Sequence, residues 1–352
     1  MLINLVKIFI PTALAFFIGI AITPVATHFF YKYKMWKKKT RSSTAISDEF
    51  KDVHKDKENR ELSVPCVGGI IIWSSVLISI AVVYILSIIY PDSLFVKLNF
   101  FSRSQTLIPI AIFILGALLG LVDDMLEIKG KSHITRSSVW YTRSKIFIVM
   151  ILGILAGSWF FYKLGITGIH IPFDGIWYLG FLIIPFVVLV VLATFSSGVI
   201  DGIDGLSGGV LATIFTSYAV IALVNNQIDL SALCGAITGA ILAFLWFNIP
   251  PARFYMGETG MMPLTVTLAT IAFLTDTVLL LPIIAFPLVA TSFSSSAQII
   301  SKKFFGRRIF RVAPLHHHFE VLGWPSYKVT MRYWVLGIMF CIVGVILTII
   351  SK

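Results

Sequence analysis

Residues 107–124 read LIPIAIFILGALLGLVDD, an apolar run that ends in two adjacent carboxylates. A helix needs about 20 apolar residues to cross the hydrocarbon core of a bilayer. This run is one of many, because 57% of the 352 residues are hydrophobic, only 13% are charged, and the mean hydropathy is +0.92. A soluble domain is roughly a quarter charged. The composition therefore predicts an integral membrane protein.

Ten apolar segments are candidates for transmembrane helices. They lie near residues 4–30, 67–90, 106–122, 144–162, 176–197, 207–224, 231–248, 261–275, 278–300 and 332–350. The third and eighth are short, and Pro282 and Pro287 predict a kink or break in the ninth. The expected fold is an all-α integral membrane protein of about ten helices. It forms a single domain over residues 1–352, with a charged loop at 31–63.

Basic residues are distributed unevenly between the two sides of this arrangement. Of 28 Lys and Arg residues, 23 lie in or beside one set of loops and five lie on the other side. The basic set comprises the loops 31–66, 123–143, 198–206, 249–260 and 301–331. Cytoplasmic loops are enriched in Lys and Arg, so this set is expected in the cytoplasm and both termini outside. For the 31–63 loop a solvated segment is favoured over a clamp for lipid headgroups.

The net charge of +11 does not indicate a nucleic-acid partner, because most aromatic residues lie inside the apolar runs rather than among the charges. The first apolar run is too long for a signal peptide, and the strong positive charge follows it, so a retained first helix is expected. Cys66, Cys234 and Cys341 lie far apart without a CxxC pair. They are interpreted as reduced packing residues.

Acidic residues concentrate at the side expected to be cytoplasmic. Asp123 and Asp124 end an apolar run, where the helix dipole disfavours negative charge and adjacent carboxylates repel each other. A compensating cation is expected there, either a metal ion or one of Lys129, Lys131 and Lys145.

Two glycine-rich segments on the same side also carry acids. Asp201 and Asp204 lie in SSGVIDGIDGLSGG, where the glycines permit close approach of a ligand. The two acids would share a face if the segment were helical. In the segment 255–260, Gly257 and Gly260 could let backbone amides reach phosphate oxygens, with Glu258 on a metal.

Three consecutive histidines, His316, His317 and His318, lie in APLHHHFEVLGW at 313–324. Successive helical side chains diverge by about 100°, so a helix could not direct all three at one ion, whereas His316 and His318 could share one from an extended segment. The chain offers no spaced set of ligands for a closed zinc site. Hydrogen bonding to phosphate or sugar oxygens is therefore favoured, with a solvated loop as the alternative.

Carboxylates, histidines, lysines and glycine turns on one membrane face indicate Mg²⁺-assisted phosphoryl chemistry on a lipid phosphate. Five motifs then occur in order: VPCVGG (64–69), DD (123–124), DGIDGL (201–206), MGETG (256–260) and APLHHHFEVLGW (313–324). Together they resemble the phospho-N-acetylmuramoyl-pentapeptide-transferase family, bacterial enzymes that make the first lipid-linked peptidoglycan precursor. HHHFE with GW separates this branch from the related transferases for N-acetylglucosamine phosphate.

The resemblance implies transfer of phospho-MurNAc-pentapeptide from UDP-MurNAc-pentapeptide to undecaprenyl phosphate, with release of UMP. It also implies ten helices in the bacterial inner (cytoplasmic) membrane, Mg²⁺ dependence and a homodimer. Asp123, Asp124 and Asp201 would be catalytic, and Glu258 with Asp201 would bind the metal. The residues implied to bind substrate are Ile203, Asp204, Asn248, Tyr255, Gln298, His316, His317, His318 and Lys145.

The chain departs from the family's pattern at several motif positions. It has Val64 for Thr, Glu127 for the DDxxK lysine (with Lys129 near enough to substitute), Phe195 and Gly198 where asparagines are common, and Glu258 for Asp.

Other functions fit less well. A transferase for a different UDP-sugar is the nearest alternative, and the histidine segment argues against it. A secondary transporter using Asp123, Asp124 and Asp201 would place these groups near the membrane midplane, whereas here they gather at one face. A membrane metalloprotease lacks its HExxH helix motif.

Overall fold

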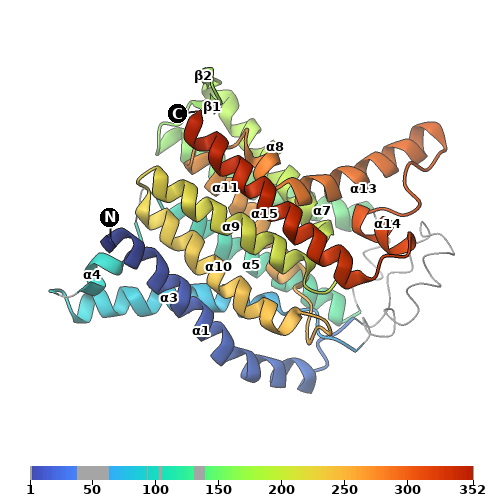
Figure 1. Cartoon of the computed structure of the whole chain (residues 1–352), viewed down its shortest axis with the longest axis horizontal. Helices are drawn as coiled ribbons and strands as arrows, with labels where there is room; N and C mark the ends of the chain where they lie inside the picture. Colours follow the sequence, from blue (N-terminus) through green and yellow to red (C-terminus); the bar gives the residue numbers. More distant parts are fainter. Residues whose placement is uncertain (1, 38–62, 93, 103–104, 131–138, 352) are drawn as a thin grey trace.

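The computed structural model describes residues 2–37, 63–92, 94–102, 105–130 and 139–351 as a helical bundle (Figure 1). Its long helices are α1 (Leu2–Lys32), α3 (Gly69–Ile89), α5 (Leu107–Ile128), α7 (Val139–Tyr162), α8 (Ile183–Ser196), α9 (Leu206–Val224), α10 (Ile228–Asn248), α11 (Gly257–Leu274), α13 (Phe286–Phe305) and α15 (Ser326–Ile350). The short ones are α4 (Leu94–Leu98), η1 (Gly180–Leu182), η2 (Ser197–Ile200), α12 (Leu281–Ile284) and α14 (Leu315–Val321).

Nine helices among the described residues are long and apolar enough to cross a membrane, which confirms a multi-pass membrane protein. They are those at 3–32, 69–89, 107–128, 143–162, 180–200, 206–224, 228–248, 257–274 and 326–350. Each corresponds to one of the ten expected segments. The expected ends were wrong by several residues at 106–122 and at 332–350, because α5 continues to Ile128 and α15 begins at Ser326.

The ninth expected segment, 278–300, is broken as its prolines predicted. Helix α12 ends at Ile284 and α13 begins at Phe286, with Pro287 in the first turn of α13. Proline lacks a backbone N–H and cannot continue a helix that precedes it. Helix α13 then projects away from the bundle toward α14 (Figure 1). It is not among the nine apolar spans, and its last turn carries Lys302 and Lys303.

One element differs from the all-α expectation. Residues 168–171 (β1) and 175–178 (β2) form an antiparallel hairpin in which Ile171 pairs with Gly175. Gly175 has a φ of 101°, a left-handed conformation that suits a tight hairpin turn. The expected segment 176–197 therefore began too early, because its first residues belong to β2.

The centre of the bundle is formed by α10 and α11, the most buried of the apolar spans. Helix α10 packs against α1, α3 and α9, and α11 packs against α5, α8 and α3. Both chain termini and the hairpin lie at one end of the bundle, and α14 lies toward the opposite end (Figure 1). The three cysteines are free and buried, as expected of packing residues. The segment 38–62, which holds most of the charged loop, lies outside the described residues.

Candidate active site

The first turn of α11 is held by a carboxylate from α5. The side chain of Asp124, 1% exposed, accepts hydrogen bonds from the backbone N–H of Glu258 (3.2 Å) and of Thr259 (2.8 Å). It also accepts one from the hydroxyl of Thr259 (2.6 Å). The positive end of a helix dipole stabilises a carboxylate at this position. Asp124 therefore ties the end of α5 to the start of α11.

Close backbone contacts make this junction possible. A Cβ atom added to Gly120 of α5 would lie 2.2 Å from the carbonyl oxygen of Glu258, so α5 and α11 can meet only where position 120 has no side chain. Small residues allow membrane helices to approach in this way.

Asp201 approaches the same turn from η2. Its Oδ1 accepts a hydrogen bond from the Ser207 hydroxyl (2.7 Å), and its Oδ2 accepts one from the backbone N–H of Gly257 (3.3 Å). The amides of residues 257–259 thus donate to Asp124 and Asp201, whereas the sequence suggested that they reach phosphate. Gly257 has a φ of 67°, and a Cβ there would clash with the carbonyl of Cys66.

Lys145 of α7 supplies the cation that the adjacent acids were expected to need. Its ammonium lies 2.6 Å from Asp123 Oδ2 and 3.0 Å from Glu258 Oε1. The bridge is largely shielded, since the side chains of Lys145 and Asp123 are 16% and 7% exposed. The site therefore brings together four carboxylates and a lysine: Asp123, Asp124, Asp201, Glu258 and Lys145.

The donor set at this turn suits a magnesium ion that substrate oxygens complete. Magnesium usually takes one or two carboxylates together with phosphates and water rather than an all-protein cage. Within the described part of the chain, no group of three or more His, Cys, Asp or Glu side chains is arranged so that it could hold a metal ion by itself. Glu258 lies in the first turn of α11 and Asp201 contacts the Gly257 amide of that turn, so both bring carboxylate oxygens to it; the Glu258 side chain remains 27% exposed.

Asp204 and Asn248 form hydrogen bonds that hold neighbouring loops together. Asp204 accepts a hydrogen bond from the backbone N–H of Ala252 (3.2 Å). The Asn248 amide accepts one from the N–H of Gly205 (2.9 Å) and donates one to the carbonyl of Phe254 (2.8 Å). Residues 201–205 form turns rather than a helix, so Asp201 and Asp204 do not share a helical face.

The glycine motif at 64–69 runs beside Tyr255. The backbone N–H of Tyr255 donates to Pro65, and its carbonyl accepts from Gly68, both at 2.8 Å. Ile203 is 6% exposed and packs in the core. Burial, with a smaller contribution from the Asp124 carboxylate, raises the pKa of the Cys66 thiol to about 12. Cys66 is therefore a neutral packing group at the edge of the site.

The histidines lie on a helix, α14, rather than on an extended segment. A Cβ added to Gly202 would lie 2.5 Å from His316 Nε2 and 2.9 Å from His317 Nε2, so both rings meet the backbone beside Asp201. His317 Nδ1 lies 2.8 Å from Glu320 Oε2. Burial and the neighbouring Arg311 lower the pKa of His318, which keeps this ring neutral at pH 7.

Gln298 positions the segment before these histidines. Its side-chain oxygen accepts hydrogen bonds from the N–H groups of Ile309 and Phe310 (both 3.0 Å), and its amide donates to the carbonyl of Phe310 (2.9 Å). Gln298 thus orders the chain between α13 and α14.

The structure bears on two of the substitutions within the family's motifs. Glu127 lies 3.5 Å from Lys37, so a lysine from the segment that follows α1, and not only the expected Lys129, reaches this corner of the site. At Gly198 an added Cβ would meet only Met261, at 3.9 Å, so the position has room for a side chain. Nothing in the structure explains Val64 or Phe195.

Three residues that matter to this geometry were not singled out from the sequence: Thr259, Ser207 and Lys37. Thr259 and Ser207 follow the motif acids closely in the sequence, which was the available signal. Lys37 lies in a run of basic residues and carries no distinguishing feature.

Comparison with known proteins identifies the class. Residues 106–276, from the start of α5 to just beyond α11, match the family model described as glycosyl transferase family 4. The matched stretch contains every carboxylate of the cluster together with Lys145. Over this stretch the protein is similar to membrane transferases of this class.

Its similarity to individual proteins is more specific. The phospho-N-acetylmuramoyl-pentapeptide-transferase of Geobacillus thermodenitrificans is 30% identical over 345 residues, which cover 96% of this chain and 97% of the relative. That of Bacillus cytotoxicus is 29% identical over 337 residues, 96% of each chain. This chain belongs to the phospho-N-acetylmuramoyl-pentapeptide-transferase family. Membership confirms the family expected from the motifs, and with it the reaction that forms the first lipid-linked peptidoglycan precursor.

Proposed function

We propose that the protein transfers phospho-MurNAc-pentapeptide from UDP-MurNAc-pentapeptide to undecaprenyl phosphate at the inner membrane of a bacterium. An oxygen of the lipid phosphate attacks the phosphorus that carries the sugar; a new phosphoanhydride bond forms, the old one breaks, and UMP leaves. The observation that supports this site most directly is the convergence of Asp123, Asp124, Asp201 and Glu258 on the first turn of α11.

Asp123 and Lys145 are assigned to the acceptor phosphate. Lys145 is paired with Asp123, and its ammonium is a positive charge fixed within the carboxylate cluster. A fixed cation beside a transferring phosphoryl group stabilises the charge that develops as the bond breaks. Asp124 acts differently, because its oxygens already accept three hydrogen bonds from residues 258–259. It is a positioning residue for α11.

Asp201 and Glu258 are assigned to Mg²⁺. An ion held by these two residues would supply positive charge that neutralises the pyrophosphate as its bond breaks. Ser207 and the amide of Gly257 orient the carboxylate of Asp201 for this task. His316 and His317, which meet the backbone beside Asp201, are assigned to sugar or phosphate oxygens.

The nucleoside is assigned to the region between the glycine motif and the turns at 201–205. Tyr255 lies at its edge and is half-buried, which suits stacking against uracil. Asp204 and Asn248 shape this region through the loops that they hold, and Ile203 packs in the core beside them. Gln298 contributes by ordering the segment before the histidines. The functional unit is a single domain over residues 1–352 that pairs as a homodimer.

A transfer assay tests the proposal. Purified protein in nanodiscs is given undecaprenyl phosphate and radiolabelled UDP-MurNAc-pentapeptide, with Mg²⁺ or with a chelator. Labelled lipid should form only with Mg²⁺, and labelled UDP-N-acetylglucosamine should give no lipid product. Product from UDP-N-acetylglucosamine but not from the pentapeptide substrate would assign the chain to a different transfer.

A further inference from the structure

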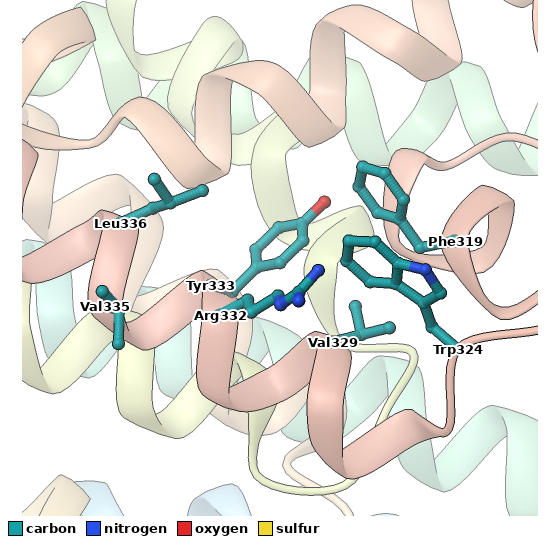
Figure 2. Close-up of a pocket in the computed structure, with 7 residues that line it drawn as sticks. All are labelled: Phe319, Trp324, Val329, Arg332, Tyr333, Val335 and Leu336. Carbon is teal, nitrogen blue, oxygen red and sulfur yellow. The ribbon is translucent and has the colours of Figure 1, made fainter.

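A cavity of about 410 Å³ lies where α14 and α15 meet, outside the carboxylate cluster (Figure 2). It is lined by Phe319, Trp324, Val329, Arg332, Tyr333, Val335 and Leu336. Of these residues Arg332 alone is charged. None of them belongs to the transferase site described above.

Two cations stand at one aromatic ring of this cavity. The Arg332 guanidinium lies 4.0 Å from the centroid of the Trp324 ring, and the Lys328 ammonium lies 5.4 Å from it. Figure 2 shows the Arg332 side chain extended toward Trp324. Trp324 is itself stacked on Phe319, with ring centroids 4.8 Å apart, so the platform beneath the cations is rigid. Within the described ranges neither cation forms an ion pair with a carboxylate.

The wall of the cavity that continues along α15 is apolar and open to the surroundings. Val335 and Leu336 are 60% and 48% exposed, and both lie within the membrane span 326–350. Lys328 and Arg332 occupy the first two turns of that span. Positive charge therefore stands at the membrane-surface end of an apolar trough, with a tryptophan at the boundary where such rings are enriched.

This arrangement matches the two parts of a phospholipid. A phosphate would lie on the cations, where Arg offers several N–H donors to phosphate oxygens. An acyl chain would lie along the apolar wall and cover the exposed side chains of Val335 and Leu336. Basic pockets between transmembrane helices on the cytoplasmic side bind anionic headgroups for these reasons. We propose that this cavity holds one anionic diacylglycerophospholipid, such as a phosphatidylglycerol.

The geometry of α15 separates this lipid from the acceptor substrate. Successive residues turn by about 100°, so Lys328, Arg332 and Leu336 share one face of the helix. Thr330 and Trp334 share another face, from which they donate to the carbonyls of Asp204 (3.2 Å) and Gly205 (3.1 Å). The bound lipid would thus contact one face of α15, while the other face of α15 holds the turns beside Asp201.

Native mass spectrometry of the full-length protein tests the site. Phosphatidylglycerol, phosphatidylcholine and inorganic phosphate are titrated separately against wild type, against Lys328→Gln/Arg332→Gln, and against Lys302→Gln/Lys303→Gln. The last variant is the matched control, because it removes two cations from the end of α13. Phosphatidylglycerol affinity should fall roughly tenfold or more in the first variant and stay unchanged in the control. Phosphatidylcholine should bind weakly, and free phosphate should not compete.

A second variant keeps the charges and fills the trough. Leu336→Trp should also weaken phosphatidylglycerol binding. This variant tests the cavity independently if the charge variant fails to fold. Equal phosphatidylglycerol affinity in wild type and both cavity variants would overturn the proposal. Displacement of phosphatidylglycerol by one equivalent of undecaprenyl phosphate would also overturn it, because the cavity would then belong to the acceptor.

Discussion

At the scale of single residues, the site depends on hydrogen bonds that fix carboxylates before substrate arrives. Asp124 is the clearest case, because three hydrogen-bond donors fix the orientation of its buried carboxylate. Water cannot take the place of a lost donor at this buried position. Asp123 and Glu258 differ from it because each shares Lys145. Removal of a donor to Asp124 should therefore disturb position, whereas removal of charge from Glu258 should disturb metal affinity.

Thr259→Val tests the positioning role of Asp124. The variant keeps the shape and the backbone N–H but loses the hydroxyl donor, leaving one carboxylate oxygen poorly satisfied. We expect a loss of about 1–3 kcal/mol in stability and a clear fall in turnover. Thr265→Val is the control, because this buried hydroxyl bonds only within α11, to Met261 and Met262. Equal turnover in both variants, measured alongside thermal unfolding in detergent, would remove Thr259 from the account.

Glu258 is the motif position at which the metal assignment can be tested. Glu258→Gln keeps the length of the side chain but loses its charge, so turnover should collapse at ordinary Mg²⁺ concentrations. Glu258→Asp should keep measurable activity and need more Mg²⁺, because the shorter side chain must still reach an ion at about 2.1 Å. The measurement is a Mg²⁺ titration of initial rates. A curve for the Gln variant that overlays wild type would show that Glu258 serves α11 only as a favourable charge at its first turn.

At the scale of elements, close packing of α5 on α11 sets where the carboxylates meet. Gly120→Ala would place a Cβ 2.2 Å from the Glu258 carbonyl, so α11 must shift. We expect lower turnover and a lower melting temperature. Gly337→Ala is the control, since this buried helical glycine has ordinary contacts around its added Cβ, at 3.4 and 3.6 Å. Full activity in Gly120→Ala would mean that the site tolerates a wider separation between α5 and α11.

The elements also show which features can be predicted from sequence. Long apolar runs predicted the helices because hydrophobicity over about 20 residues is a strong signal, and Pro287 predicted the break before α13. The hairpin at 168–178 was missed, since two four-residue strands carry little periodic signal. The acids of the site were predicted from motifs. Their partners Thr259 and Ser207 were not, because hydrogen-bond partners depend on how the helices approach each other.

At the scale of the whole molecule, the distribution of basic residues and the arrangement of the helices both place the active site at one end of the bundle. Both termini lie at one end of the bundle, and α14 lies toward the other (Figure 1). The sequence assigns 23 of 28 basic residues to one set of loops, and this set includes the segment 301–331 that carries α14, so the α14 side is expected in the cytoplasm.

Accessibility of introduced cysteines checks this orientation. Ser102→Cys precedes α5 at the end that carries the termini, and Ser326→Cys begins α15 at the opposite end. In intact cells an impermeant maleimide should label position 102 and spare position 326, which should react only after permeabilisation. Labelling of both positions from the same side would contradict the expected topology.

Asp123, Asp201 and Glu258 are the carboxylates expected to act on the phosphates and the metal during transfer. The most direct test is turnover of Asp201→Asn, which keeps a hydrogen-bond acceptor for Ser207 but loses the charge. We expect turnover to fall by ~10²-fold or more, with helical content and melting temperature near wild type. Asp174→Asn, an exposed acid in the hairpin turn, should keep wild-type turnover. Near-wild-type transfer by folded Asp201→Asn would contradict the assignment.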